Sequence, residues 1–153
     1  MSVKQLSVFL DNSPGTLSKF TQLMASANVN MIALTIADTT SFGILRCLVA
    51  QSAETLKIIA NAGYSARLTS VIAAVVPDKP GGLAGVLETL AARGVSIEYC
   101  YSFAHGLTIA DIGNDASSGA ALVLQVDDIS KAEEILEKNG VKLLSMDSFA
   151  LIA

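Results

Sequence analysis

The stretch Leu10-Asp11-Asn12-Ser13-Pro14-Gly15-Thr16-Leu17 returns later in the chain as Val76-Pro77-Asp78-Lys79-Pro80-Gly81-Gly82-Leu83. A helix-like stretch follows each Pro-Gly pair and leads to Val29-Asn30-Met31 in the first copy and Val95-Ser96-Ile97 in the second. A repeat of this kind indicates two similar structural units. We therefore expect two small domains, each with the same loop in front of its first helix.

The length of the chain agrees with this division. Its 153 residues suffice for two domains of about the smallest size that folds without a metal or disulfides. We place the domains at 1–70 and 71–153. The second copy is longer, and its extra residues fall in a surface loop at about 105–119, which we expect to be mobile.

The order of the expected elements is the same in both copies. Alternating apolar residues predict strands, and apolar residues three and four apart predict helices. The strands are expected at 4–10, 29–37, 42–50 and 64–68, and again at 71–76, 95–103, 120–126 and 141–152. The order β-α-β-β-α-β predicts an α+β fold with two ferredoxin-like domains, each an antiparallel sheet with both helices on one face.

Composition excludes several classes of partner. Apolar residues make up 52% of the chain, the net charge is −4, and the mean hydropathy is +0.54. Basic residues are scattered, which argues against nucleic-acid binding. No apolar run reaches membrane-spanning length and no signal peptide is apparent, so we expect a cytoplasmic protein without membrane contact. The apolar composition favours burial of surface in a homodimer.

Few residues are suited to catalysis or metal binding. His105 is the single histidine, so one chain cannot build a multi-histidine metal site or a proton relay. Cys47 and Cys100 lack a CxxC partner, and we expect both to be buried as small apolar residues. Gly81-Gly82 lacks the residues of a phosphate-binding P-loop. The sequence therefore predicts a protein that is not an enzyme and needs no cofactor.

The repeated loop is suited to a small anion. Pro14 and Pro80 fix the backbone before a helix, and the glycines after them let a ligand approach it. The first amides of a helix have no partner within it and lie at the positive end of its dipole. A carboxylate is stabilised there. A plain strand-to-helix turn is the simpler alternative, but it does not require the same flanking residues twice.

Asn-Ser-Pro-Gly-Thr-Leu (12–17) and Asp-Lys-Pro-Gly-Gly-Leu (78–83), each followed by a helix and a Val-Asn-Met or Val-Ser-Ile stretch, resemble the ACT domain signature. The resemblance covers essentially the whole chain, as a stand-alone pair of ACT domains. It implies a regulatory protein that binds a free amino acid at an interface between ACT domains. The family's contacts come from the loop before the first helix and the start of the second strand.

Carried to this sequence by position, the resemblance implies one set of ligand-binding residues in each copy. The full set is Asn12, Ser13, Pro14, Gly15, Thr16, Leu17, Asn30 and Met31, with Asp78, Lys79, Gly81, Gly82, Leu83, Ser96 and Ile97. Asn30 of the first copy is replaced by the shorter Ser96 in the second, so the first copy is the better candidate. The alternatives are an oligomerisation module with degenerate loops and, less favoured, an unrecognised enzyme. A regulated enzyme is a possible partner.

Overall fold

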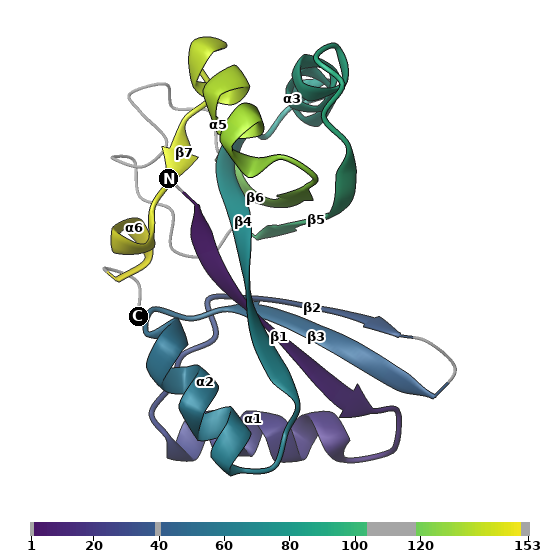
Figure 1. The fold of residues 1–153 in the computed structure, drawn as a ribbon, viewed down its shortest axis with the longest axis vertical. Helices are drawn as coiled ribbons and strands as arrows, with labels where there is room; N and C mark the ends of the chain where they lie inside the picture. Colours follow the sequence, from purple (N-terminus) through teal and green to yellow (C-terminus); the bar gives the residue numbers. More distant parts are fainter. Residues whose placement is uncertain (1, 39–40, 104–118, 151–153) are drawn as a thin grey trace. The chain divides into compact units, whose positions relative to one another are not determined.

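The computed structural model describes residues 2–38, 41–103 and 119–150, and the chain forms two compact units (Figure 1). Lys4–Thr69 is called the first unit here and Ser70–Ser148 the second unit. Phe149 and Ala150 group with the first unit, whereas Ser2 and Val3 group with the second. The boundary falls inside one long strand, β4 (Ala66–Pro77).

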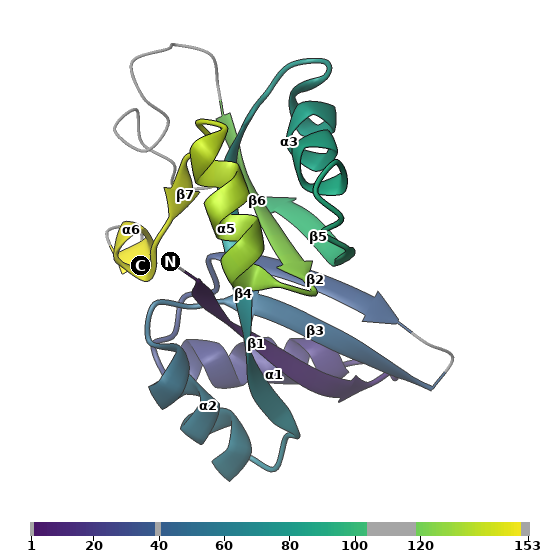
Figure 2. The ribbon, with the colours of Figure 1, turned by 45° about the horizontal axis from the view of Figure 1, so that its top comes forward.

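The first unit is a four-stranded antiparallel arrangement with two helices. Its elements are β1 (Val3–Asp11), α1 (Thr16–Ser26), β2 (Ala33–Asp38), β3 (Phe42–Leu48), α2 (Ser52–Asn61) and the first part of β4. The strand order is β2-β3-β1-β4. Val8 lies opposite Leu45, and Leu45 lies opposite Ile36. Both helices cover the same face of the sheet (Figure 1, Figure 2).

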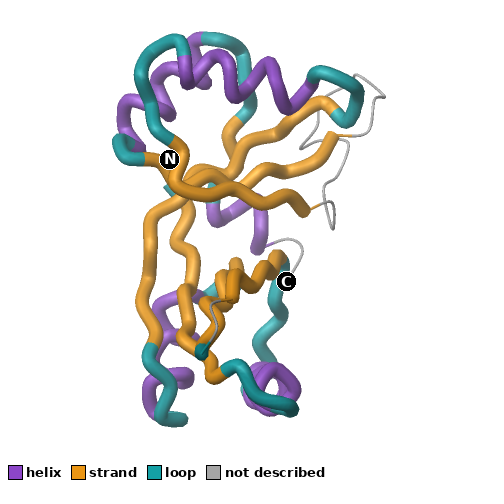
Figure 3. Tube along the Cα trace, turned by 90° about the vertical axis from the view of Figure 1, so that its right-hand side faces the viewer, coloured by secondary structure: helices purple, strands orange, loops and turns teal. Residues whose placement is uncertain are grey.

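The second unit repeats this topology. Its elements are the rest of β4, α3 (Gly82–Ala91), β5 (Ile97–Phe103), β6 (Gly119–Val126), α5 (Ile129–Lys138), β7 (Leu143–Leu144) and α6 (Met146–Ala150), whose last residues leave the unit. The order β7-β4-β6-β5 matches the order of the first unit, and α3 and α5 lie on one side of the sheet (Figure 3). The predicted ferredoxin-like fold class is confirmed.

The two cores are equivalent position by position. Leu6, Val8 and Leu10 of β1 face α1 and α2, and Ile72, Ala74 and Val76 occupy the same places in the second unit. The helices contribute Phe20 and Met24 in the first unit and Val86 and Leu90 in the second. Phe20 packs edge-on against Tyr64, with ring centroids 5.4 Å apart. The repeat therefore extends from the loop to the interior of each unit.

The two cysteines differ in burial. Cys47 is buried in the first core, as predicted, and burial raises its thiol pKa to about 12. Cys100 is exposed, so its prediction as a buried residue is wrong. It lies on β5, at the end of the strand order of the second unit, where residues alternate between half-buried and exposed. Glu98 and Ser102 share its exposed face.

The end of the chain also departs from prediction. A strand was expected at 141–152, but β7 holds only Leu143 and Leu144 before α6 begins. The Ser145 N–H donates to Ser148 Oγ (3.3 Å), and the Ser148 N–H donates to the Ser145 carbonyl (3.1 Å). These local hydrogen bonds favour a helical turn, because they pair backbone groups of Ser145 within the segment. In a strand the same groups would need hydrogen bonds to a neighbouring strand.

Two further strand boundaries differ from the prediction. The strands expected at 64–68 and 71–76 form one continuous strand, β4. β2 begins at Ala33 rather than at residue 29, because the end of α1 uses the preceding backbone: Asn28 has φ 55°, and the Val29 N–H donates to the Met24 carbonyl (2.9 Å). The predicted mobile loop at 105–119 lies almost wholly outside the described residues.

Candidate functional site

The repeated Pro-Gly loops have the same backbone conformation at the start of α1 and α3. Gly15 has φ 85° and ψ −9°, and Gly81 has φ 84° and ψ −9°. This left-handed conformation favours glycine. The Thr16 N–H donates to the Ser13 carbonyl (3.3 Å), and the equivalent Gly82 N–H donates to the Lys79 carbonyl (3.0 Å). The repeat in sequence is therefore a repeat in geometry.

Both of these helices begin without a side-chain cap. Neither α1 nor α3 has a side-chain hydrogen bond at its N-cap, whereas Asp128 caps α5 by accepting from the Lys131 N–H (3.0 Å). Amides in the first turn of a helix have no partner within it. Apart from Thr16 and Gly82, whose amides donate to loop carbonyls, the first-turn amides of α1 and α3 have no N-cap side chain as acceptor, whereas α5 has the Asp128 carboxylate.

The two loops differ where the helix begins. In the first unit the Thr16 and Ser13 hydroxyls are hydrogen-bonded at 2.8 Å. In the second unit Gly82 replaces Thr16, and a Cβ built there would lie 2.1 Å from the Pro77 carbonyl oxygen. The Lys79 N–H also donates to that carbonyl, at 3.0 Å. The second loop thus packs closely against the carbonyl of Pro77, the last residue of β4.

An open groove lies beside the loop in each unit, about 590 Å³ in the first and about 500 Å³ in the second. The first groove is lined by Phe9, Leu10, Asp11, Thr16, Lys19, Leu23, Ala62, Gly63, Tyr64 and Ser65. The second groove is lined by Val75, Val76, Pro77, Lys79, Gly81, Gly82, Gly85, Val86, Thr89, Gly119, Asn139, Gly140, Val141 and Lys142. Every residue of the first groove has its repeat counterpart in the second.

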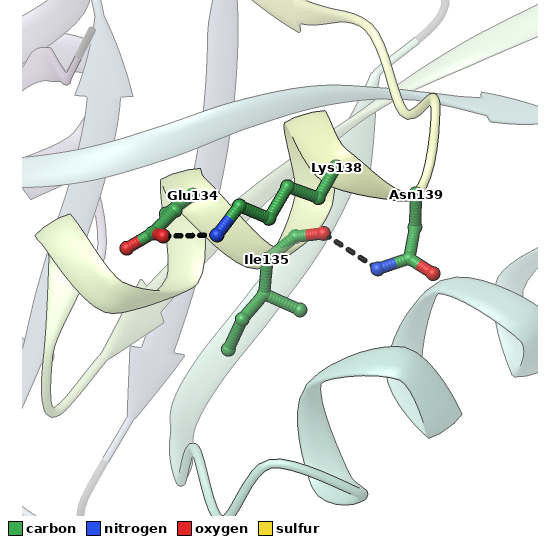
Figure 4. A network of polar contacts seen from close by, with 4 residues as sticks. All are labelled: Glu134, Ile135, Lys138 and Asn139. Carbon is green, nitrogen blue, oxygen red and sulfur yellow. Dashed lines mark hydrogen bonds and ion pairs between the residues drawn. The ribbon is translucent and has the colours of Figure 1, made fainter.

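Sequence reasoning missed one wall of these grooves. That wall is the turn after the second helix of each unit, 62–65 in the first groove and 139–142 in the second. Gly63 and Gly140, which close those helices with positive φ, are the matching signal in the sequence. The Asn139 amide donates to the Ile135 carbonyl (2.8 Å) and closes α5 beside the groove (Figure 4).

The predicted loop residues lie on or near these grooves. Thr16 lines the first groove, and Lys79, Gly81 and Gly82 line the second. Asp78 and Leu83 line a smaller hollow of about 200 Å³ that also includes Ser102. Leu17 and Leu83 remain 40% and 44% exposed at equivalent positions. The remaining loop residues, Asn12, Ser13, Pro14 and Gly15, are also exposed.

The predicted strand residues lie at the other end of the helix. α1 has 11 residues, so at about 1.5 Å per residue it is roughly 16 Å long, and it lies between Asn12 and Asn30 in the chain. Met31 follows Asn30, and Ser96 and Ile97 hold the corresponding places after α3. Within one unit the predicted loop residues therefore lie before the first turn of the helix and the predicted strand residues after its last turn.

In the second unit, the carboxylate of Asp127 binds the backbone just before β5. Asp127 Oδ1 accepts from the Ser96 N–H (3.0 Å) and from the Asp128 N–H (2.9 Å), and the Asp127 N–H donates to the Ser96 carbonyl (3.1 Å). The repeat places Ala50 at the position of Asp127. Asn30 of the first unit thus has no equivalent carboxylate at that position.

The described part of the chain offers little for acid–base or metal chemistry. Among described residues, no group of three or more His, Cys, Asp or Glu side chains is placed to hold a metal ion. The pKa of the exposed Glu134 is lowered by its hydrogen bond and ion pair with Lys138, one turn along α5 (Figure 4). This pair is a surface interaction of the helix. No described helix is long and apolar enough to cross a membrane.

The fold and the repeated loops define a pair of ACT domains, and comparison with known proteins agrees. The family model of the ACT domain pair matches residues 1–152, so the chain belongs to that family. A crystal structure of a Bacteroides thetaiotaomicron protein is 37% identical and has a TM-score of 0.83, covering 94% of this chain and 92% of that one. No curated protein sequence matches the chain.

More distant structures share the fold. The ligand-free regulatory subunit of aspartate kinase from Thermus thermophilus has a TM-score of 0.61 at 14% identity, covering 88% of this chain and 91% of that one. The regulatory subunit of aspartate kinase from Thermus flavus has a TM-score of 0.60 at 16% identity, covering 88% of each chain. At these identities the likeness concerns the fold.

Proposed function

We propose that the protein is a non-catalytic regulator that binds a free amino acid through the first unit. The observation that carries the proposal is the uncapped start of α1, where Gly15 leaves the backbone open and the exposed Asn12 lies in the loop just before it in the chain. The amides of the first turn suit the carboxylate of a zwitterion. The Asn12 and Asn30 side-chain oxygens suit its ammonium group. We propose no cofactor, since the amino acid itself is the signal.

The separation of Asn12 and Asn30 implies how the site is assembled. Because the whole of α1, roughly 16 Å long, lies between them, we infer that a small ligand contacts the loop of one chain and the strand start of another. We therefore propose a cytoplasmic homodimer with amino-acid sites at an interface between ACT domains. Binding would then favour one packing of the dimer and pass that state to a regulated enzyme.

A thermal-shift screen against the twenty amino acids tests this function. The cognate amino acid at about a hundred times its dissociation constant should stabilise the protein by about 2.7 kcal/mol. Asn12→Ala with Asn30→Ala should abolish that shift and leave the melting temperature without ligand nearly unchanged, because both residues are exposed. The matched control is Asp78→Ala with Ser96→Ala in the second unit, which should keep the shift. If both double variants lost the ligand-induced shift equally, the ligand would not bind through the first unit alone.

Oligomerisation without a ligand is the second candidate function, and one observation favours it. Besides Leu17 in the loop, the strands of the first unit expose large apolar side chains that are each 39–44% accessible: Phe9, Leu34, Ile36 and Phe42. The rings of Phe9 and Phe42 are 6.2 Å apart on neighbouring strands. Phe9 and Phe42 share one face of the sheet, whereas Leu34 and Ile36, which lie opposite the core residues Cys47 and Leu45, share the other face. Exposed apolar side chains of this kind favour burial against a partner. A stable dimer that no amino acid stabilises would select this function over the sensor.

A further inference from the structure

β2 is the strand at the outer edge of the first unit's sheet. Among the described residues it pairs with β3 alone, and it ends the strand order of the sheet. A strand at the edge of a sheet leaves backbone N–H and C=O groups that another strand can bind. We propose that β2 pairs antiparallel with β2 of a second copy of this chain, so that two first units form one continuous sheet.

The side chains along this edge are apolar and exposed. Leu34 and Ile36 lie opposite core residues of β3, which puts them on the face of the sheet that the helices cover. They are nevertheless 44% and 42% accessible. From Ala33 to Ala37 the strand holds no charged residue and no proline, which are among the features that keep an edge strand from pairing. Pairing with a second copy removes this apolar surface from water.

The equivalent edge strand of the second unit, β5, has features that oppose pairing. Its register with β6 shifts at the exposed Glu98. Irregular register and charged side chains both disfavour the addition of a strand to an edge. The repeat also places Cys100 and Ser102 where the first unit has Leu34 and Ile36. The two edges of the repeat thus differ, and the apolar, regular one is β2.

An antiparallel pair of β2 strands centred on Thr35 is self-complementary. In this register Leu34 lies opposite Ile36 of the second copy, and Ala33 lies opposite Ala37. The large apolar side chains, two from each chain, then meet on one face, while the two threonines meet on the other; pairs of both kinds stabilise a sheet. A twofold axis repeats each contact, which is the usual symmetry of a homodimer.

The same pairing accounts for an amino-acid site shared by two chains, a step that rests on the function proposed above. The Asn12 N–H donates to the Ser41 carbonyl (3.5 Å), so the loop before α1 lies at the end of the sheet where β2 finishes and β3 begins. Asn30 precedes the opposite end of β2. Because antiparallel strands run in opposite directions, Asn30 of the second copy comes to the end of the sheet that carries the loop of the first.

Analytical ultracentrifugation of the full chain over a concentration series, with no amino acid present, tests the pairing. We expect a monomer–dimer equilibrium. Leu34→Lys with Ile36→Lys places charges along the edge and should weaken dimerisation at least about a hundredfold. The matched control is Cys100→Lys with Ser102→Lys on β5, which should leave the dimer unchanged. All four side chains are exposed, so both variants should fold, which circular dichroism checks. A chain that stays monomeric, or a dimer that survives the β2 variant, would overturn the proposal.

A cysteine crosslink tests the register and does not depend on the lysine variants. In Cys100→Ser chains, Thr35→Cys should join two copies through a disulfide when a copper oxidant is added, because residue 35 lies opposite itself. Ala37→Cys should not, since the pairing holds the two copies of residue 37 about 14 Å apart. Cys47 is buried and does not compete. No crosslink at residue 35, or equal crosslinking at both positions, would contradict the pairing. Neither experiment contains an amino acid, so a failure of pairing is distinguished from a failure of ligand binding.

Discussion

The first and second units have equivalent cores and the same fold, but they differ at two equivalent positions. At the loop, the first unit pairs the hydroxyls of Ser13 and Thr16, while the second has Gly82 pressed against the Pro77 carbonyl. At the strand start, the first unit leaves Asn30 exposed without a nearby Asp equivalent, while the second ties Ser96 to Asp127. A duplicated scaffold can thus keep its interior while the loop before its first helix and the start of its second strand diverge.

Gly82→Ala should cause the largest loss of stability among these variants. It tests whether the second loop tolerates a side chain at the position where the first loop carries Thr16. The new Cβ would lie 2.1 Å from a backbone carbonyl oxygen, so the strand end or the helix start must move. We expect a loss of about 2–3 kcal/mol in the free energy of unfolding, measured by urea denaturation.

Gly85→Ala is the control for that change on the same helix. Its Cβ meets no atom within 4 Å, so it should instead stabilise the protein by up to about 1 kcal/mol. If both substitutions had the same effect, the close approach of Gly82 to Pro77 would not be what distinguishes the two loops.

Asp127→Ala removes the carboxylate that closes the strand start of the second unit. Two backbone N–H groups lose their acceptor, and we expect a cost of about 1–2 kcal/mol in urea denaturation. The reverse change, Ala50→Asp, places a carboxylate near Asn30 in the first unit. There it should weaken amino-acid binding if Asn30 contacts the ligand. No change in either unit would show that Asp127 does not distinguish them.

The smallest effect concerns the Glu134–Lys138 pair, which the first unit lacks because Lys57 and Asn61 stand at those positions. Lys138→Ala should raise the Glu134 pKa toward its ordinary value, as measured by carboxyl carbon NMR. Because the folded-state pKa is depressed, the pair stabilises the fold above the ordinary pKa, and this contribution disappears as pH falls through the depressed value. An unchanged pKa would mean that the pair is not formed in solution.

The sequence predicted the order of elements, because Leu6, Val8 and Leu10 alternate with other residues in the first copy and an apolar run of strand length, 71–76, occupies the equivalent place in the second. It failed where local hydrogen bonds outweigh apolar pattern. At the C-terminus, Ser145 and Ser148 start a helix within a stretch that is apolar enough for a strand. One wall of each groove was missed because it comes from a turn distant in sequence, whose glycine, Gly63 or Gly140, was interpreted only as the end of a helix.

The central claim is that the first unit, and not the second, holds a free amino acid. Isothermal titration calorimetry of the purified protein against the twenty amino acids measures this directly. The account predicts saturable binding of a cognate amino acid at one molecule per chain, lost in Asn30→Ala and retained in Ser96→Ala. No saturable heat from any amino acid, or binding that survives Asn30→Ala unchanged, would contradict it.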